Sequence, residues 1–101
     1  MKRYACNRLY TDTGSLPQAI VTLNEKGEVE SYFSFLEEES ATEWLGGVIV
    51  LSDKKDKPQC ASFQDFRLIM TNAKQLNYAW HISNFDFQKE EFTSQSIICR
   101  L

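Results

Sequence analysis

The only histidine in the chain, His81, is the natural starting point in a search for acid–base chemistry. Imidazole is the one side chain that ordinarily changes its charge near neutral pH, so it can both give and take a proton. Trp80 and Ile82 alternate with it as they would on a strand, and if they point into the core, His81 points outward. We therefore treat His81 as a candidate binding residue and expect no catalytic residue.

Three cysteines, Cys6, Cys60 and Cys99, are the next candidates for reactive or metal-binding chemistry. They are odd in number, far apart and never paired as Cys-x-x-Cys, which argues against a disulfide framework and against a zinc knuckle. Structural zinc sites usually contain two close ligand pairs, because a close pair costs little loop entropy to organise. The sequence predicts reduced, buried thiols and neither a metal nor a cofactor.

Carboxylates and glycines form no recognisable site either. The aspartates at positions 53, 56, 65 and 86 do not have the spacing of a calcium-binding loop. Gly46-Gly47 lacks the further residues of a phosphate-binding or dinucleotide-binding loop. Asp65 is better explained as part of a helix cap with Ser62, and the two glycines as a turn that opens a strand.

Large aromatic residues are the remaining candidates, because amphipathic rings dominate the binding energy of many protein interfaces. Trp44, Tyr78 and Trp80 could each anchor a partner. Core packing is the competing explanation for at least two of them. Together with His81 they form the set of candidate binding residues.

Size and charge narrow the class of protein. The chain has 101 residues, of which 43% are hydrophobic and 25% charged, as expected for a single globular domain over residues 1–101. Its formal net charge of −3 argues against nucleic acid as a partner, since phosphate backbones need a concentrated basic surface. No apolar run approaches the roughly 20 residues that cross a bilayer, and the N-terminus lacks the apolar core of a signal peptide. We therefore expect a cytoplasmic protein without a membrane partner.

The first half of the scaffold is predicted to be β-structure. Residues 2–10 alternate as a half-buried strand does. Residues 19–23 and 29–36 are two β-prone runs around a polar connection that ends in glycine, which indicates a hairpin. In its second arm Phe33 and Phe35 share one parity and should face the core.

The second half combines strands with one helix. Residues 48–51 are apolar on both parities, which is typical of a central strand covered on both faces. Apolar residues at three- and four-residue steps predict a helix over residues 62–76. Residues 78–87, with a bulge at Asn84, and residues 92–101 complete the strands.

These elements predict a β-rich α+β fold with about six mostly antiparallel strands and one helix near residues 62–76; a sandwich-like arrangement is compatible with them. Residues 40–43 have the spacing to cap a short helical turn that carries Trp44. The predicted core consists of Tyr4, Val21, Leu23, Phe33, Phe35, Val48, Ile49, Val50, Phe66, Ile69, Met70, Ala73, Trp80, Ile82 and Ile98.

The first half also follows an order of turns and strands seen in a known family. An opening strand that ends in an aromatic residue precedes Leu16-Pro17-Gln18-Ala19-Ile20-Val21-Thr22-Leu23, then Asn24-Glu25-Lys26-Gly27-Glu28-Val29, and finally Gly47-Val48-Ile49-Val50-Leu51. Across residues 2–51 this order resembles the N-terminal segment of amidohydrolase-superfamily enzymes of the deaminase or chlorohydrolase type. The resemblance implies the small β-sandwich that lies beside the metal-dependent (β/α)₈ barrel of those enzymes.

The catalytic part of that family has no counterpart here. The resemblance implies a Pro-Gly-x-x-x-x-His-x-His run after the last strand, where this chain has Ser52-Asp53-Lys54-Lys55-Asp56-Lys57. The residues that remain cannot build a barrel, which typically needs about 250. The resemblance therefore implies the sandwich without its enzyme, and it transfers no catalytic residue.

Three functional hypotheses follow. We expect a non-catalytic binding or protein-interaction domain, with a homodimer as one form of it, because exposed sheet edges and spare aromatic residues can recognise a partner. The alternative is a small enzyme, or an accessory subunit of a hydrolase, that uses His81 beside a carboxylate or thiol. The third is a structural remnant of the sandwich whose uncovered apolar face is hidden by dimerisation.

Overall fold

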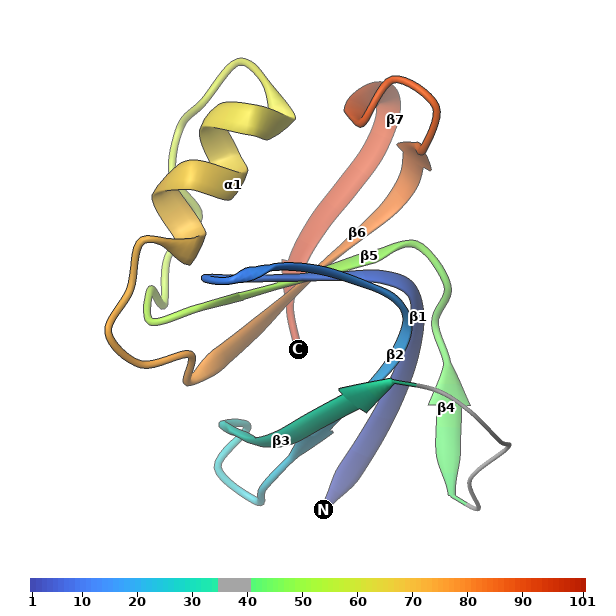
Figure 1. The fold of residues 1–101 in the computed structure, drawn as a ribbon, viewed down its shortest axis with the longest axis vertical. Coiled ribbons are helices and arrows are strands. Elements are labelled where there is room, and N and C mark those ends of the chain that lie inside the picture. The colour runs from blue at the N-terminus through green and yellow to red at the C-terminus, as the bar shows by residue number, and fades with distance from the viewer. Residues whose placement is uncertain (35–40) are drawn as a thin grey trace.

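The computed structural model describes residues 1–34 and 41–101, and Figure 1 shows a strongly bent sheet with one helix against it. The elements are β1 (Lys2–Thr11), β2 (Gly14–Leu23), β3 (Val29–Ser34), β4 (Thr42–Trp44), β5 (Val48–Ser52), α1 (Phe63–Thr71), β6 (Tyr78–Asp86) and β7 (Glu91–Arg100). The strand order is β3-β2-β1-β5-β6-β7, and β4 pairs with β1. The helix α1 has nine residues. Within the described residues, no helix is long and apolar enough to cross a bilayer.

Most neighbouring strands are antiparallel. This holds for β1–β2, β2–β3, β5–β6 and β6–β7, while β4 and β5 run parallel to β1. The predicted fold class, a β-rich α+β domain with mostly antiparallel strands and one helix, is confirmed. The described strands belong to one mixed sheet of seven strands, which is not closed into a barrel.

β1 and β2 curve strongly (Figure 1). The strand pairing and the backbone dihedral angles show where the sheet changes direction. The partner of β1 changes at Asn7, from β4 on one side of that residue to β5 on the other. Gly46 and Gly47 form the turn between β4 and β5 with φ of 68° and 62°, and Asn7 Oδ1 accepts the N–H of Gly47 at 2.8 Å. On β2, Gln18 also has a positive φ, 48°, a conformation that side chains rarely favour.

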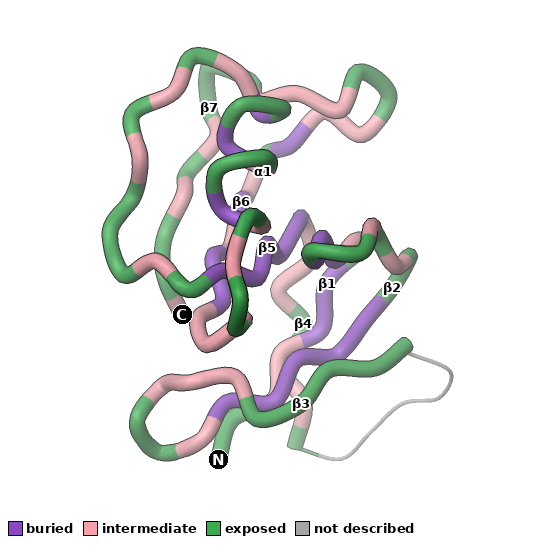
Figure 2. Tube along the Cα trace, turned by 60° about the vertical axis from the view of Figure 1, so that its left-hand side comes forward, coloured by how far each residue is buried: buried purple, intermediate pink, exposed green. Residues whose placement is uncertain are grey.

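Buried side chains gather into two clusters on the two faces of β5. Val48 and Val50 belong to the cluster beneath α1, whereas Ile49 and Leu51 belong to the cluster on the opposite face. All of β5 is buried, so the prediction of a central strand covered on both faces is confirmed. Figure 2 shows the buried segments concentrated in β1, β2 and β5.

The helix covers the first of these clusters through Phe63, Phe66 and Met70. The predicted cap is confirmed, since Ser62 Oγ accepts the Asp65 N–H at 3.2 Å. The predicted end at residue 76 is wrong, because Asn72 leaves the helical conformation with ψ of 77°. Ile69 was expected in the core but lies 37% exposed on the outer side of the helix.

Two further predictions are corrected on β3 and β4. Phe33 is 39% exposed instead of buried, because β3 is an edge strand that pairs with β2 alone among the described strands. The helical turn expected over residues 40–43 is replaced by β4, which pairs with the edge of β1 that β5 leaves open. Ser40 and the predicted core residue Phe35 lie outside the described residues.

The rest of the predicted core is largely as expected. Tyr4, Ala73 and Ile98 are half-buried. The buried members are Val21, Leu23, Val48, Ile49, Val50, Phe66, Met70, Trp80 and Ile82.

Candidate binding cleft

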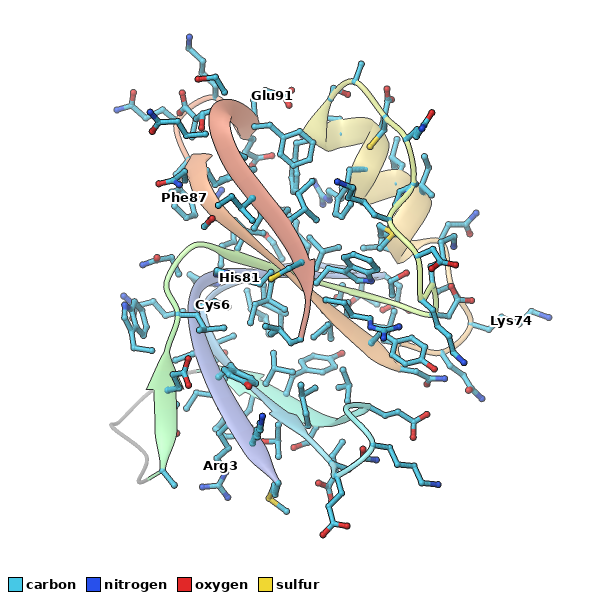
Figure 3. The ribbon with its side chains drawn as sticks, turned by 180° about the vertical axis from the view of Figure 1, so that it is seen from behind. Arg3, Cys6, Lys74, His81, Phe87 and Glu91 are labelled. Atoms are coloured by element: carbon cyan, nitrogen blue, oxygen red, sulfur yellow. The ribbon has the colours of Figure 1, made fainter. Side chains whose placement is uncertain are left out.

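His81 lies half-buried on β6, on the face opposite to Trp80 and Ile82, as the alternation predicted. Its Nε2 is 3.0 Å from the carbonyl oxygen of Gly46, and because a carbonyl can only accept, Nε2 carries the proton and donates. Figure 3 shows the ring near the middle of the sheet. The hydrogen bond ties the turn between β4 and β5 to β6, which gives His81 a structural task.

The other three candidate binding residues lie in separate places. Trp80 is buried in the core beneath α1. Tyr78 is half-buried, with two cationic side chains over its ring. Trp44 is 54% exposed on β4. Of these three residues, Trp44 comes near His81, because its Nε1 would lie 3.6 Å from a Cβ added at Gly46, whose carbonyl accepts the His81 proton.

The three cysteines are free and differ in exposure. Cys6 is buried, Cys60 is half-buried and Cys99 is exposed, so the prediction of buried thiols is wrong for Cys99, which lies on the edge strand β7. Burial raises the pKa of Cys6 to about 11. Burial also raises the pKa of Cys60, helped by the Asp65 carboxylate. Both thiols are therefore protonated at neutral pH.

A cleft of about 450 Å³ opens between β7 and the connection from β5 to α1. Figure 2 shows these two segments running alongside each other. The floor is apolar, because Cys60, Phe92 and Ile98 pack half-buried against the core beneath α1 and are left partly uncovered. The remaining lining residues are Lys57, Pro58, Gln59, Thr93 and Ser96.

Two hydrogen bonds hold the connection against the sheet at one end of this cleft. Trp80 Nε1 donates to the carbonyl of Lys54 at 3.0 Å, and the Arg100 guanidinium donates to the carbonyl of Lys55 at 3.2 Å. Backbone acceptors held in this way fix the path of the connection along the sheet.

Glu91 holds the other end of the cleft. Its Oε1 accepts the N–H of Phe63, the first residue of α1, at 2.6 Å and the N–H of Phe92 at 2.9 Å. Figure 3 shows this residue close to the start of the helix. Glu91 is the first residue of β7, and no local sequence pattern could reveal its role because its helical partner is far away in the chain.

The outer edge of β7 pairs with no strand among the described residues. Leu101 donates its N–H inward, to the carbonyl of Ala79 at 2.9 Å. Because the direction of backbone groups alternates along a strand, the N–H and C=O groups of Arg100 and Ile98 point outward. An edge with such groups can accept an added strand.

A polar bulge occupies the first part of this edge, opposite Asn84. The backbone carbonyl of Asn84 accepts hydrogen bonds from the hydroxyls of Thr93 and Ser96 at 2.7 and 2.9 Å. The side-chain amide of Asn84 donates to the carbonyl of Gln95 at 3.1 Å. The predicted bulge is confirmed, since Asn84 has φ of 54° and the register shifts there. The regular open edge is therefore limited to residues 97–100.

No family model matches this chain. The curated proteins and the solved structures contain no match to it either. The resemblance of residues 2–51 to amidohydrolases therefore stays a prediction, and the cleft geometry carries the functional argument.

Few of the residues that line the cleft are ionisable. Lys57 and Cys60 are the ionisable residues of the cleft lining, and the raised pKa of Cys60 leaves its thiol uncharged at neutral pH. Within residues 1–34 and 41–101, no three acidic, cysteine or histidine side chains gather as a metal site would require. The cleft thus offers an apolar floor and open backbone groups.

Proposed function

We propose that this chain is a non-catalytic interaction domain that binds an extended segment of a partner protein along β7. The observation that carries the proposal is the apolar cleft next to the outward backbone groups of Ile98 and Arg100. A strand added there would form main-chain hydrogen bonds with β7 and direct alternate side chains over Cys60 and Phe92.

An extended segment fits this edge better than a second copy of the chain. Two copies paired through β7 would each present the bulge of residues 93–96, which interrupts the regular ladder. The connection that carries Lys57 and Gln59 also borders the cleft and limits the space beside the edge. We therefore expect self-association through β7 to be weaker than capture of a single strand.

The position of His81 supports the non-catalytic part of the proposal. Its Nε2 proton is used in the bond to Gly46, and His81 is absent from the residues that line the cleft. The variant His81→Ala should therefore keep its peptide affinity. An affinity loss above about tenfold in a folded His81→Ala protein would contradict this assignment.

The direct test is selection of ligands from a phage-displayed library of random nonapeptides, followed by calorimetry on synthetic peptides. The variant Gln59→Trp should fill the cleft from its exposed rim and weaken binding by about tenfold or more. Gln88→Trp makes the same substitution at an exposed turn residue outside the cleft and should bind like the wild type. Failure to enrich any peptide, or equal binding to Gln59→Trp, would overturn the proposal.

The native cysteines provide a second measurement. A bound peptide should slow alkylation of Cys60 by iodoacetamide, whereas Cys99, on the opposite face of β7, should react at an unchanged rate. Two N-methylated versions of the peptide, one methylated at the odd-numbered amides and the other at the even-numbered amides, should differ in binding. Only one of them should lose binding, because every second amide of the bound strand faces β7. Unchanged alkylation of Cys60 in the saturated complex would place the peptide elsewhere.

A further inference from the structure

We infer that the captured segment is acidic, with its carboxylates at the end of the cleft next to Lys57 and Arg100. This inference rests on the proposed function and adds the chemistry of the ligand. The charges around the cleft carry it.

One end of the cleft is positively charged. Lys57 lines the cleft, and it takes part in no ion pair within the described part of the chain. Lys55 and Arg100 lie beside one another, since the Arg100 guanidinium bonds the Lys55 carbonyl at 3.2 Å and both cations lie over the ring of Tyr78. Asp56 is the acidic residue within this stretch, so the local balance is positive.

The acidic residues near the opposite end of the cleft are already engaged. Glu91 accepts two backbone N–H groups, and Glu90 lies 3.6 Å from the guanidinium of Arg8. Asp65 lies in the first turn of α1, where the helix dipole favours a negative charge. The positive end is therefore the part of the cleft with uncompensated charge.

This local charge is opposite in sign to that of the chain, whose formal net charge is −3. A carboxylate on the guest strand would meet Lys57 at the rim, where the side chain is exposed and can reach it. Charge pairs of this kind contribute to selectivity and to the rate of association, and they weaken as salt rises. The ligand that fits is an extended segment with apolar residues over Phe92 and Ile98 followed by aspartate or glutamate.

The inference is tested with the unbiased peptide library named above. We expect enrichment of aspartate and glutamate over lysine and arginine among the selected peptides. Replacing glutamate by glutamine in a selected peptide should weaken binding by about tenfold. Raising NaCl from low to high concentration should weaken the glutamate peptide more than the glutamine peptide.

A charge-reversal pair locates the effect. Lys57→Glu should weaken the glutamate peptide by about tenfold or more and improve binding of the same peptide made with lysine. Lys74→Glu makes the same change in charge at an exposed residue that Figure 3 shows pointing into solvent away from β7, and it should match the wild type. Equal effects of the two variants, with no acidic preference, would overturn the inference while leaving strand capture intact. An absence of any selected peptide would instead overturn the proposed function.

Discussion

Gly47 is the residue at which the sheet depends most on the absence of a side chain. Its φ is 62°, and an added Cβ would overlap the carbonyl oxygen of Ile82 and lie 3.2 Å from Nε2 of His81. We expect Gly47→Ala to lower the free energy of unfolding by about 3 kcal/mol or more, from backbone strain and steric overlap together. Urea denaturation measures this loss.

Gly46→Ala is the matched control, because Gly46 has a similar φ of 68° but more room. The nearest atom to its added Cβ would be Asn7 Oδ1, at 3.4 Å. The loss should be about 1–2 kcal/mol, which is the cost of the backbone conformation alone. Equal losses in the two variants would show that the overlap with β6 has no energetic effect.

The buried thiol of Cys6 makes stability depend on pH. Burial raises its pKa to about 11 from the ordinary value of 9.0, so the unfolded chain releases this proton at a lower pH than the folded chain does. The stabilising effect is complete below pH 9 and is lost as the pH rises toward 11. Its full size is about 2–3 kcal/mol.

Urea titrations between pH 8 and 11 of the wild type and of Cys6→Ala test this expectation. The variant begins less stable, because it leaves a small cavity, but its stability should fall less steeply with pH. All other ionisable groups are common to the two proteins, so their contributions cancel in the comparison. Parallel slopes would contradict the assignment.

At the scale of elements, Glu91 joins β7 to the start of α1. Removing its carboxylate leaves the N–H groups of Phe63 and Phe92 without this acceptor, so Glu91→Ala should cost about 2–3 kcal/mol. Glu91→Gln keeps an acceptor oxygen and should cost about 1 kcal/mol or less. Thermal unfolding followed by circular dichroism provides the measurement.

Ser62→Ala provides the comparison within the helix. It removes one local cap, at a cost of about 1 kcal/mol, and leaves the contact between helix and strand in place. If Glu91→Ala cost less than Ser62→Ala, the bond across elements would not anchor α1.

Elements that depend on neighbouring residues were predictable from the sequence. The cap of Ser62 with Asp65, the bulge at Asn84 and the two-sided strand at residues 48–51 each follow from a short pattern. β4 was missed because three residues carry almost no pattern, and its strand conformation depends on the free edge of β1. Phe33 was misplaced because periodicity cannot show that β3 lies at an edge.

The candidate site was less predictable than the fold. None of Trp44, Tyr78, Trp80 and His81 lines the cleft. The walls of the cleft come from a polar connection and from the last strand, and only folding brings Gln59 and Ser96 to the same cleft. The half-covered side chains of the floor look like ordinary core residues in the sequence, because their coverage depends on how the start of α1 packs against β7.

At the scale of the whole molecule, β5 couples the two clusters of buried side chains. Val50 packs beneath α1, and Ile49 packs on the opposite face. We expect Val50→Ala and Ile49→Ala each to cost about 2–4 kcal/mol and to lower the stability of the whole fold. Unfolding curves from tryptophan fluorescence and from far-UV circular dichroism should coincide in both variants. Separate transitions would show that the two clusters unfold independently.

The bulge between Thr93 and Ser96 has a consequence for a crowded solution. A strand that accepts guests along its whole length would also accept the same strand of identical molecules and begin a growing fibre. The bulge interrupts the ladder after Phe92, and we expect the regular edge that remains, residues 97–100, to be too short to start such growth. We expect the same interruption to limit the affinity for a guest strand and to disfavour edge-to-edge pairing between copies of the chain.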